Sequence, residues 1–391
     1  MWRHRPDENL LKSLVLCNQM KRVAILTTHR ANNFGAVLQA YSLVMACREL
    51  GADAELLDWR HPDFERAFHR GWKMHRNPIP AIKYLWWHWT RETSARRAFD
   101  DFRREIPMSR PICSRTALES MGAAYDSYVV GSDQVWNPRL SAWDATKFDR
   151  SLLLDFVRDK PKNAYAASIG VKEITPETIV PEFKSAWQSF DHISMREEAG
   201  AEFVEKTIGK KVPTVLDPVL LHDADWWMKN TDEIALPSEP YLLIYNVQQW
   251  RKDSDWLVER AYECAKMNKF RVVNLLVPGQ RAKWVEDMVS VGPNEFVRYI
   301  AGASAVFANS FHASAFASIF RKPLYVHRAS FNGSPTSRFD TLAEMTGCKV
   351  NECARHGGDS LQHYDFTEIT ADRLARARTE SLRFLEDIVR G

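Results

Sequence analysis

Residues 305–326 read AVFANSFHASAFASIFRKPLYV, and this pattern predicts a buried strand, a sharp turn, a short helix and a second strand. The first four residues are an apolar run of strand length. Asn309 and Ser310 are residue types that cap helices, and the apolar residues after them recur at helical spacing. Pro323 ends that helix. The stretch therefore predicts that His312 lies in the first turn of a helix, at the mouth of a sheet.

This position would give His312 a distinctive chemistry. The N–H groups of a helix's first turn have no partner inside the helix, so they attract anions and disfavour an imidazolium. A histidine there stays neutral until a phosphate or carboxylate arrives, and the bound anion then favours the protonated ring. The same segment is equally consistent with a histidine that is hydrogen-bonded at a helix start for structural reasons.

The composition is that of an ordinary globular protein large enough for two domains. Of the 391 residues, 45% are hydrophobic and 26% charged, which excludes a disordered chain, and no apolar run has the length of a membrane span. A net charge of +3 is too small to predict nucleic acid as the main partner. The six cysteines form no Cys-x-x-Cys pair and have no histidine at zinc spacing, so neither disulfides nor a structural metal is expected. A reducing cytoplasm fits this pattern, and no signal peptide is expected.

Strands alternate with helices along most of the chain, which predicts parallel sheets covered on both faces. Two such series predict two Rossmann-like domains. The expected boundaries are an N-terminal extension at 1–19, a first domain at 20–235, and a second domain at 236–391 whose last helix covers 371–389. Outside the His312 segment, strands are expected at 23–28, 54–59, 127–130, 164–168, 192–196, 214–216, 241–247 and 271–277, and further helices at 36–50, 253–268 and 294–302.

A helical excursion expected at 60–122 is basic and aromatic. Residues 58–110 hold twelve Lys or Arg against seven Asp or Glu, and Trp72, Trp86, Trp87 and Trp89 lie among them. Trp with Lys or Arg suits peripheral contact through 72–97 with a membrane, such as the inner face of the cytoplasmic membrane. Apolar residues at helical spacing between 99 and 106, behind Ser94 as a cap, favour instead a helical layer packed on the first domain.

In open α/β sheets, ligands bind beyond the carboxyl ends of the strands, so residues just after strands are the candidate site residues. An Arg at a strand's end can donate two hydrogen bonds to one carboxylate or phosphate. Asn, Gly, Ser and Asp at such positions are also ordinary turn residues. Either Arg could simply form a surface ion pair with a neighbouring carboxylate. Asp223 and Asp225 have the spacing of a metal-binding pair, but they are better explained as a helix cap. The candidates are His312 and Asp133 for catalysis, and Arg196, Arg338, Asn33, Gly35, Ser310, Phe311, Ser132 and Gln134 for substrate binding.

Several of these residues lie in segments that resemble the polysaccharide pyruvyl transferase family. The resemblance covers about residues 21–344, and the Ser-Phe-His-Ala segment around His312 is its most specific part. The matching segments are Asn33-Phe-Gly-Ala-Val-Leu-Gln-Ala-Tyr41, Gly131-Ser-Asp-Gln-Val-Trp-Asn137, Ser194-Met-Arg-Glu197, Leu216-Asp-Pro-Val219, Asn309-Ser-Phe-His-Ala-Ser-Ala-Phe316 and Ser337-Arg338.

The resemblance implies two Rossmann-like domains in a GT-B-like arrangement with a cleft between them. It implies transfer of a pyruvyl group from phosphoenolpyruvate to two hydroxyls of one sugar in an exopolysaccharide, capsule or cell-wall glycan precursor, without metal or organic cofactor. The family's essential His falls on His312 and its donor-binding Arg on Arg196. Many members carry an acidic residue where this chain has Ala36, so that acid/base role has no counterpart here.

The residues themselves agree with this chemistry. A donor with a phosphate and a carboxylate needs fixed cations and helix N-termini, and ketal formation needs a proton donor and a base. His312 is the candidate general acid and Asp133 a weaker candidate base. The acceptor would be a sugar or a lipid-linked oligosaccharide. Two alternatives stay open: a GT-B-like glycosyltransferase that uses a sugar nucleotide, and a non-catalytic glycan-binding relative.

Overall fold

The computed structural model describes residues 20–61, 81–138, 148–170, 182–247, 255–276, 288–327, 337–352 and 368–391. Within these ranges, the side chains of residues 81–92, 337, 352 and 368–370 are not described. The extension expected at 1–19 lies outside the described residues, as does the part of the helical excursion at 62–80.

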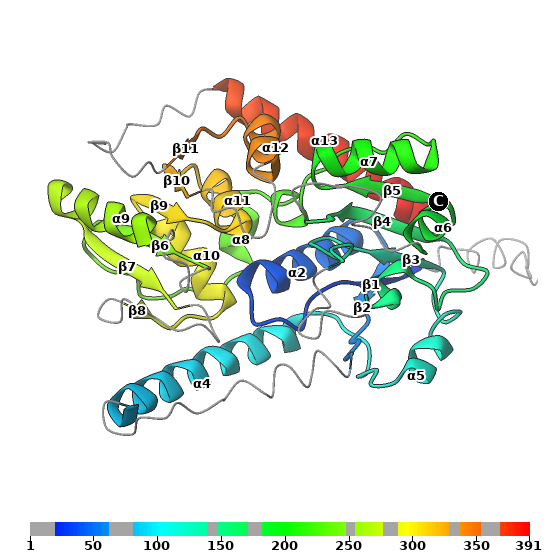
Figure 1. Cartoon of the computed structure of the whole chain (residues 1–391), viewed down its shortest axis with the longest axis horizontal. Coiled ribbons are helices and arrows are strands. Elements are labelled where there is room, and N and C mark those ends of the chain that lie inside the picture. The colour runs from blue at the N-terminus through cyan, green and yellow to red at the C-terminus, as the bar shows by residue number, and fades with distance from the viewer. Residues whose placement is uncertain are drawn as a thin grey trace, which may run out of the picture.

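The first half of the chain forms a five-stranded parallel sheet in the order β2-β1-β3-β4-β5 (Figure 1). Its strands are mostly buried, as expected for a parallel sheet with helices on its faces. They are β1 (Arg22–Leu26), β2 (Asp53–Leu56), β3 (Ser127–Val130), β4 (Lys162–Ala167) and β5 (His192–Met195). The helices of this half are α2 (Phe34–Glu49), α4 (Ala81–Glu105), α5 (Arg115–Ser120), α6 (Glu182–Gln188), α7 (Glu198–Ile208) and α8 (Ala224–Lys229), with 3-10 turns η1 (Arg150–Leu153) and η3 (Pro218–Leu220).

The second half forms a six-stranded parallel sheet in the order β11-β10-β9-β6-β7-β8. Its strands are β6 (Tyr241–Tyr245), β7 (Arg271–Leu275), β8 (Met288–Val289), β9 (Ala305–Ala308), β10 (Leu324–Val326) and β11 (Val350–Glu352). Its helices are α9 (Asp255–Asn268), α10 (Pro293–Gly302), α11 (Phe311–Ile319), α12 (Ser337–Thr346) and α13 (Glu368–Arg390). The two parallel sheets with their helices confirm the predicted fold class, two Rossmann-like units in a GT-B-like arrangement.

The expected strand at 214–216 is wrong. Thr214 forms only an isolated bridge with Met195, and Val215 N–H donates to the carbonyl of Met195. The ladder stops there because the N–H of Leu216 donates to Ser381 Oγ at 3.0 Å, and η3 begins two residues later. The short strands β8 and β11 were not predicted, because two or three residues carry too little pattern to be recognised.

Helix α2 lies between the two halves. Asn33 caps it by accepting a hydrogen bond from the N–H of Ala36, and most of its residues are buried. Its first residue, Phe34, stacks on Phe99 of α4 at 4.9 Å between ring centroids and on Phe296 of α10 at 4.4 Å. Apolar residues of both sheets therefore belong to one continuous core, which includes Val23 and Val306.

Helix α13 returns from the second half to the first. Figure 1 shows it beginning beside α12 and ending over the first sheet. It contacts both α12 and α2. Two of its side chains hydrogen-bond to the segment after β5: Leu216 N–H donates to Ser381 Oγ, and Arg378 Nε donates to the carbonyl of Leu220 at 2.9 Å.

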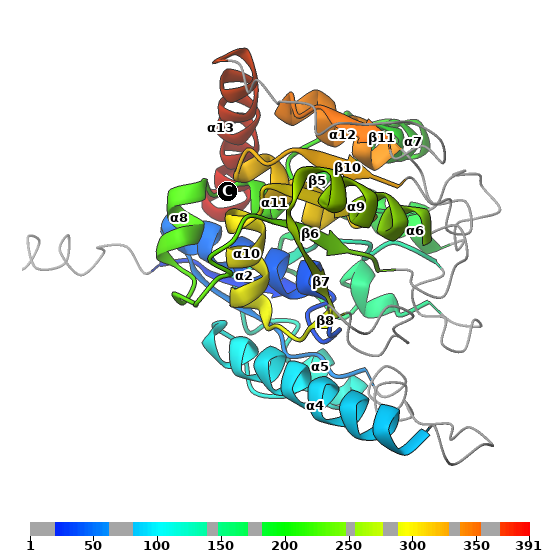
Figure 2. The ribbon, with the colours of Figure 1, turned by 90° about the vertical axis from the view of Figure 1, so that its left-hand side faces the viewer.

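Helix α4 runs along one side of the molecule (Figure 2). The last turns of α4 are packed, since Ala95, Phe99, Phe102 and the following Ile106 are buried. They contact Phe34 of the first half, as predicted, but α4 also contacts α10 of the second half, so the layer is not confined to the first domain. Ser94 lies inside the helix and does not cap it, because α4 begins at Ala81. Contact of 72–97 with a membrane stays a prediction. None of the helices in the described part of the chain has the length and apolar character to cross a bilayer.

Candidate active site

The carboxylate of Asp217 contacts side chains from both halves of the chain. It is fully buried between β5 and η3, and its Oδ1 accepts a hydrogen bond from the N–H of Val219 at 3.2 Å. Its Oδ2 lies 2.9 Å from Arg196 Nη1, 3.2 Å from Ser132 Oγ and 3.3 Å from His312 Nε2. One carboxylate oxygen therefore joins a guanidinium of the first half to an imidazole of the second.

The charges around Asp217 hold it ionised. Burial raises the pKa of its carboxyl, but the proximity of His312 and Arg196 outweighs burial and lowers the pKa below its ordinary value. The contact with His312 is a close approach rather than an aligned hydrogen bond, because Nε2 has no partner of good geometry. An ionised carboxylate at this place is arranged to stabilise the positive charge that a proton on His312 brings.

Arg196 follows β5 directly, as predicted, and is buried. Its Nη1 also lies 3.5 Å from Asp133 Oδ1, and its Nε lies 3.4 Å from Glu197 Oε1. Burial by itself lowers the pKa of this guanidinium, but the carboxylates of Glu197, Asp217 and Asp133 outweigh burial and raise it. The guanidinium carbon lies 4.5 Å from the ring centroid of Phe311, at the start of α11. None of the described residues accepts a hydrogen bond from its Nη2.

His312 is in the first turn of α11, as predicted, and its imidazole packs against Gly35 at the start of α2. A Cβ atom built on Gly35 would lie 2.0 Å from Nδ1 and 2.3 Å from Cγ of that ring. No side chain fits in this space. Glycine at position 35 is therefore required by the close approach of the ring from the other half.

Replacing Gly35 with alanine tests this contact. We expect Gly35→Ala to lower the free energy of unfolding by about 1–3 kcal/mol, because the new methyl group displaces the imidazole. In a His312→Ala background the same change should be neutral or stabilising, since alanine is the better helix former. Urea unfolding of the four proteins measures the coupling. An equal loss in both backgrounds would show that the imidazole is not the obstacle.

Arg338 brings a second guanidinium from the second half. It lies in the first turn of α12. Burial, together with the positive charge of Arg196, lowers its pKa to about 10, while Glu197 and Asp133 oppose these effects. Its Nε is buried without a hydrogen-bond partner among the described residues. An unpartnered buried cation beside Arg196 is an arrangement that suits a bound anion.

The predicted residues of the loop after β3 have different surroundings. Asp133 has a left-handed backbone, with φ of 68°, and its Oδ2 accepts a hydrogen bond from Thr28 Oγ1 at 3.0 Å. Ser132 is fully buried, and its Oγ donates to the carbonyl of Ala166 at 2.8 Å. Gln134 is half-buried, and its Oε1 accepts from Asn137. Asp133 thus lies beside Arg196 at the site, whereas Ser132 belongs to the network beneath Asp217.

Two further candidates, Asn33 and Ser310, lie at the N-terminal ends of helices. Asn33 caps α2, so its carboxamide oxygen is already in use. Ser310 is at the cap position of α11, but its side chain makes no cap hydrogen bond. Asn309, expected to cap that helix, instead accepts from the N–H of Val247 and donates to Asn246, both at 2.8 Å. The local pattern could not show this, because these partners lie more than 60 residues away.

Arg103 of α4 holds the loop that leads from β1 to α2, which was not predicted. Its buried guanidinium donates to the carbonyls of His29, Arg30 and Ala31, and to Asn32 Oδ1 at 2.7 Å. The helical excursion therefore positions the chain just before Gly35. The sequence contained no signal for this role, because Arg103 is one of twelve basic residues in its region.

These contacts define a candidate site made by residues of both halves. Arg196 and Arg338 supply two cations, Asp133, Glu197 and Asp217 supply carboxylates, and His312 supplies a group that can carry a proton. Such a set can bind a small anion and move protons beside it. The candidates His312 and Arg196 thus lie at one site, and the roles of the individual residues stay predictions.

Comparisons with solved structures return proteins that act on or transfer sugars, by their names. One is a putative UDP-N-acetylglucosamine 2-epimerase from Listeria monocytogenes, with 12% identity, coverage of 95% of this chain and 91% of that chain, and a TM-score of 0.48. Another is a UDP-N-acetylglucosamine 2-epimerase from Rickettsia bellii, with 10% identity, coverage of 95% and 97%, and a TM-score of 0.45. A third is the glycosyltransferase SnogD from Streptomyces nogalater, with 10% identity, coverage of 93% and 95%, and a TM-score of 0.42. These similarities concern the overall arrangement only.

A family comparison is more specific. No curated relative matches the chain at the level of sequence. A sequence profile described as polysaccharide pyruvyl transferase matches residues 33–326, which is most of the chain. The matched range begins at the cap of α2 and ends with β10, so it includes Asp133, Arg196, Asp217 and His312. The chain belongs to the polysaccharide pyruvyl transferase family.

Proposed function

We propose that the protein transfers the pyruvyl group of phosphoenolpyruvate onto two hydroxyls of one sugar, forms a cyclic ketal and releases phosphate. One observation carries this proposal: His312 of the second half and Arg196 of the first lie on the same oxygen of Asp217, at 3.3 and 2.9 Å. The buried Arg338, whose Nε has no partner among the described residues, adds a cation beside them. Family membership supports pyruvyl transfer to a polysaccharide as the reaction.

The donor would bind through its two anionic groups. Arg338 Nε and Arg196 Nη2 are the guanidinium nitrogens without described partners, so they are the natural contacts for the phosphate and carboxylate. The three carboxylates around Arg196 keep its plane fixed, which reduces the entropy lost when a ligand binds. The ring of Phe311 packs against the face of this guanidinium.

The reaction would proceed by addition and then substitution at C2 of the donor. His312 gives its proton to the methylene carbon C3, which becomes a methyl group, while the first sugar hydroxyl bonds to C2. The bond from C2 to the phosphate oxygen then breaks, and phosphate leaves with the electron pair. The second hydroxyl bonds to C2 and closes the ring. Of the two hydroxyl protons, one restores His312 and the other, accepted by Asp133, leaves with phosphate.

A direct assay tests the proposal. The protein is incubated with phosphoenolpyruvate and a panel of aryl galactosides, mannosides and glucosides, and products are identified by mass spectrometry together with released phosphate. We expect a pyruvylated glycoside and phosphate in equal amounts. Thermal stabilisation by UDP or GDP, without any by phosphoenolpyruvate, would instead support a glycosyltransferase. Lipid-linked oligosaccharides extend the panel, because the proposed acceptor is a sugar or a sugar on a lipid carrier.

Substitution of Arg338 should weaken donor binding without lowering the stability of the fold. In Arg338→Met we expect the KM for phosphoenolpyruvate to rise by about tenfold or more, because a charge-assisted contact is worth about 1.5–3 kcal/mol. The melting temperature should be unchanged or higher, since methionine replaces a buried cation that has an unpartnered Nε. Steady-state kinetics and thermal unfolding measure the two effects. Arg104→Met is the control, because Arg104 is exposed and, among the described residues, pairs only with Asp101 on the surface. An unchanged KM in Arg338→Met would remove Arg338 from the donor site.

A further inference from the structure

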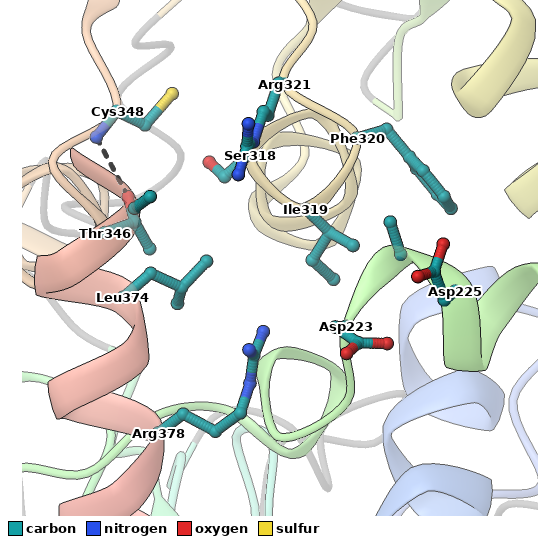
Figure 3. Close-up of a pocket in the computed structure, with 12 residues that line it drawn as sticks. Asp223, Asp225, Ser318, Ile319, Phe320, Arg321, Thr346, Cys348, Leu374 and Arg378 are labelled. Atoms are coloured by element: carbon teal, nitrogen blue, oxygen red, sulfur yellow. Dashed lines mark hydrogen bonds between the residues drawn. The ribbon is translucent and has the colours of Figure 1, made fainter. Parts of the chain in front are cut away.

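A separate cavity of about 420 Å³ lies at the other end of the helix that carries His312. Its walls are the end of α11, the start of α8, the residues after α12 and the first turns of α13 (Figure 3). Ser318, at its rim, is six residues after His312, which corresponds to about 9 Å along the helix axis. The cavity is thus distinct from the candidate active site, and its volume lies within the range of small-ligand sites, about 300–1,000 Å³.

Arg378 of α13 supplies a fixed cation to this cavity. Figure 3 shows its side chain reaching from α13 into the space below Ile319. Its Nε donates to the carbonyl of Leu220 at 2.9 Å and its Nη2 to that of His222 at 3.3 Å, so the guanidinium is held by neutral groups. Burial lowers its pKa, with the charge of Asp223 opposing this effect. In the described part of the chain no carboxylate forms an ion pair with it, and Nη1 is left for a ligand.

The opposite walls of the cavity carry a second Arg, two Asp residues and apolar side chains. Arg321, with φ of 52° just after α11, is exposed at the rim and pairs with no described carboxylate. Asp223 caps α8 through Oδ1, which leaves Oδ2 free of that bond, and Asp225 is exposed with no described partner. Apolar side chains lie between the charged ones; they are Ile319, Phe320 and Leu374.

We propose that this cavity binds a hexose that carries one carboxylate. Arg378 and Arg321 suit the carboxylate, the free oxygens of Asp223 and Asp225 suit sugar hydroxyls, and Phe320 offers a flat apolar surface to the sugar ring. Neutral sugars would leave both guanidinium groups without an anionic partner, so the site would discriminate by charge. A sugar with a pyruvyl ketal belongs to the proposed ligand class, and in this respect the inference rests on the proposed function. The cavity would then hold an acidic residue of the polymer away from the reacting centre.

The test is a binding measurement that needs no turnover. D-glucuronate is titrated into the wild-type protein and followed by saturation-transfer NMR and calorimetry, with D-glucose as the neutral control. We expect saturable binding of glucuronate and at least about tenfold weaker binding of glucose, because the charge-assisted contacts are lost. Arg321→Met should weaken glucuronate binding by about tenfold, whereas Arg376→Met, a matched change at an exposed Arg of α13 that does not line the cavity, should leave it unchanged.

His312→Ala distinguishes this cavity from the active site. Glucuronate should bind to His312→Ala as it does to the wild type, even though turnover is lost. Binding that disappears in His312→Ala and persists in Arg321→Met would place the sugar at the active site and overturn the inference. Absence of saturable binding to the wild type, or equal affinity for glucose, would also overturn it. None of these outcomes depends on whether phosphoenolpyruvate is the donor, so the two proposals fail separately.

Discussion

Replacing His312 with alanine is expected to keep the fold and to lower phosphate release from phosphoenolpyruvate, in the presence of acceptor, by about 10²–10⁴-fold. The loss follows because no other described group that can carry a proton lies beside both Asp217 and Gly35. Phosphate release at saturating donor measures kcat, and unfolding by urea measures the fold. We expect kcat to fall far more than the KM for the donor changes, since the guanidinium contacts remain.

A second histidine provides the control for this experiment. His192 lies at the amino end of β5, the end opposite to Arg196, and is half-buried. His192→Ala should therefore leave kcat within about twofold of the wild type. Turnover close to that of the wild type in His312→Ala would exclude this residue as the general acid.

Replacing Asp217 with asparagine is expected to cost both stability and activity. The change leaves Arg196 buried without its nearest carboxylate, and breaking a buried pair in this way costs about 3–5 kcal/mol. It also removes the charge beside His312 Nε2, so kcat should fall together with stability. Urea unfolding and phosphate release measure the two effects. Asp101→Asn, which removes an exposed ion pair on α4, should cost less than about 1 kcal/mol.

The same carboxylate makes stability depend on pH in a defined direction. The pKa of Asp217 is lower in the folded protein than in the unfolded chain, where it is about 3.9. The stabilisation it supplies is therefore complete above about pH 4 and is lost as pH falls through the folded pKa. Asp217→Asn should reduce the acid dependence of the unfolding free energy in this range. An acid limb as steep as that of the wild type would show that other carboxylates dominate it.

Local patterns were sufficient to predict where His312 and Arg196 lie. A buried run followed by turn residues and a helical repeat specifies strand, turn and helix within about twenty residues, and parallel strands bring such ends to one edge. The same logic located Gly35, although the reason for a glycine there is the ring of His312, which is 277 positions further along the chain. Spacing along the sequence could not show that contact.

Asp217 was not among the predicted site residues, although the segment Leu216-Asp-Pro-Val219 was noticed. Its sequence neighbours resemble a strand, and the bend that turns it toward Arg196 depends on a hydrogen bond from Leu216 to Ser381, 165 residues away. Arg103 was missed for a similar reason, because its acceptors are carbonyls more than 70 residues earlier in the chain. The positions of both residues depend on hydrogen bonds to distant segments of the chain. A single sequence does not show which distant segments come into contact.

The return of α13 to the first half has a consequence for biosynthesis. Ser381 and Arg378 brace the bend that aims Asp217, yet they belong to the part of the described chain that a ribosome makes last. While earlier segments are already collapsing, the bend has neither brace. The nascent polypeptide therefore carries an incompletely supported Asp217 until translation has passed α13, and the order of synthesis delays the assembly of the candidate site.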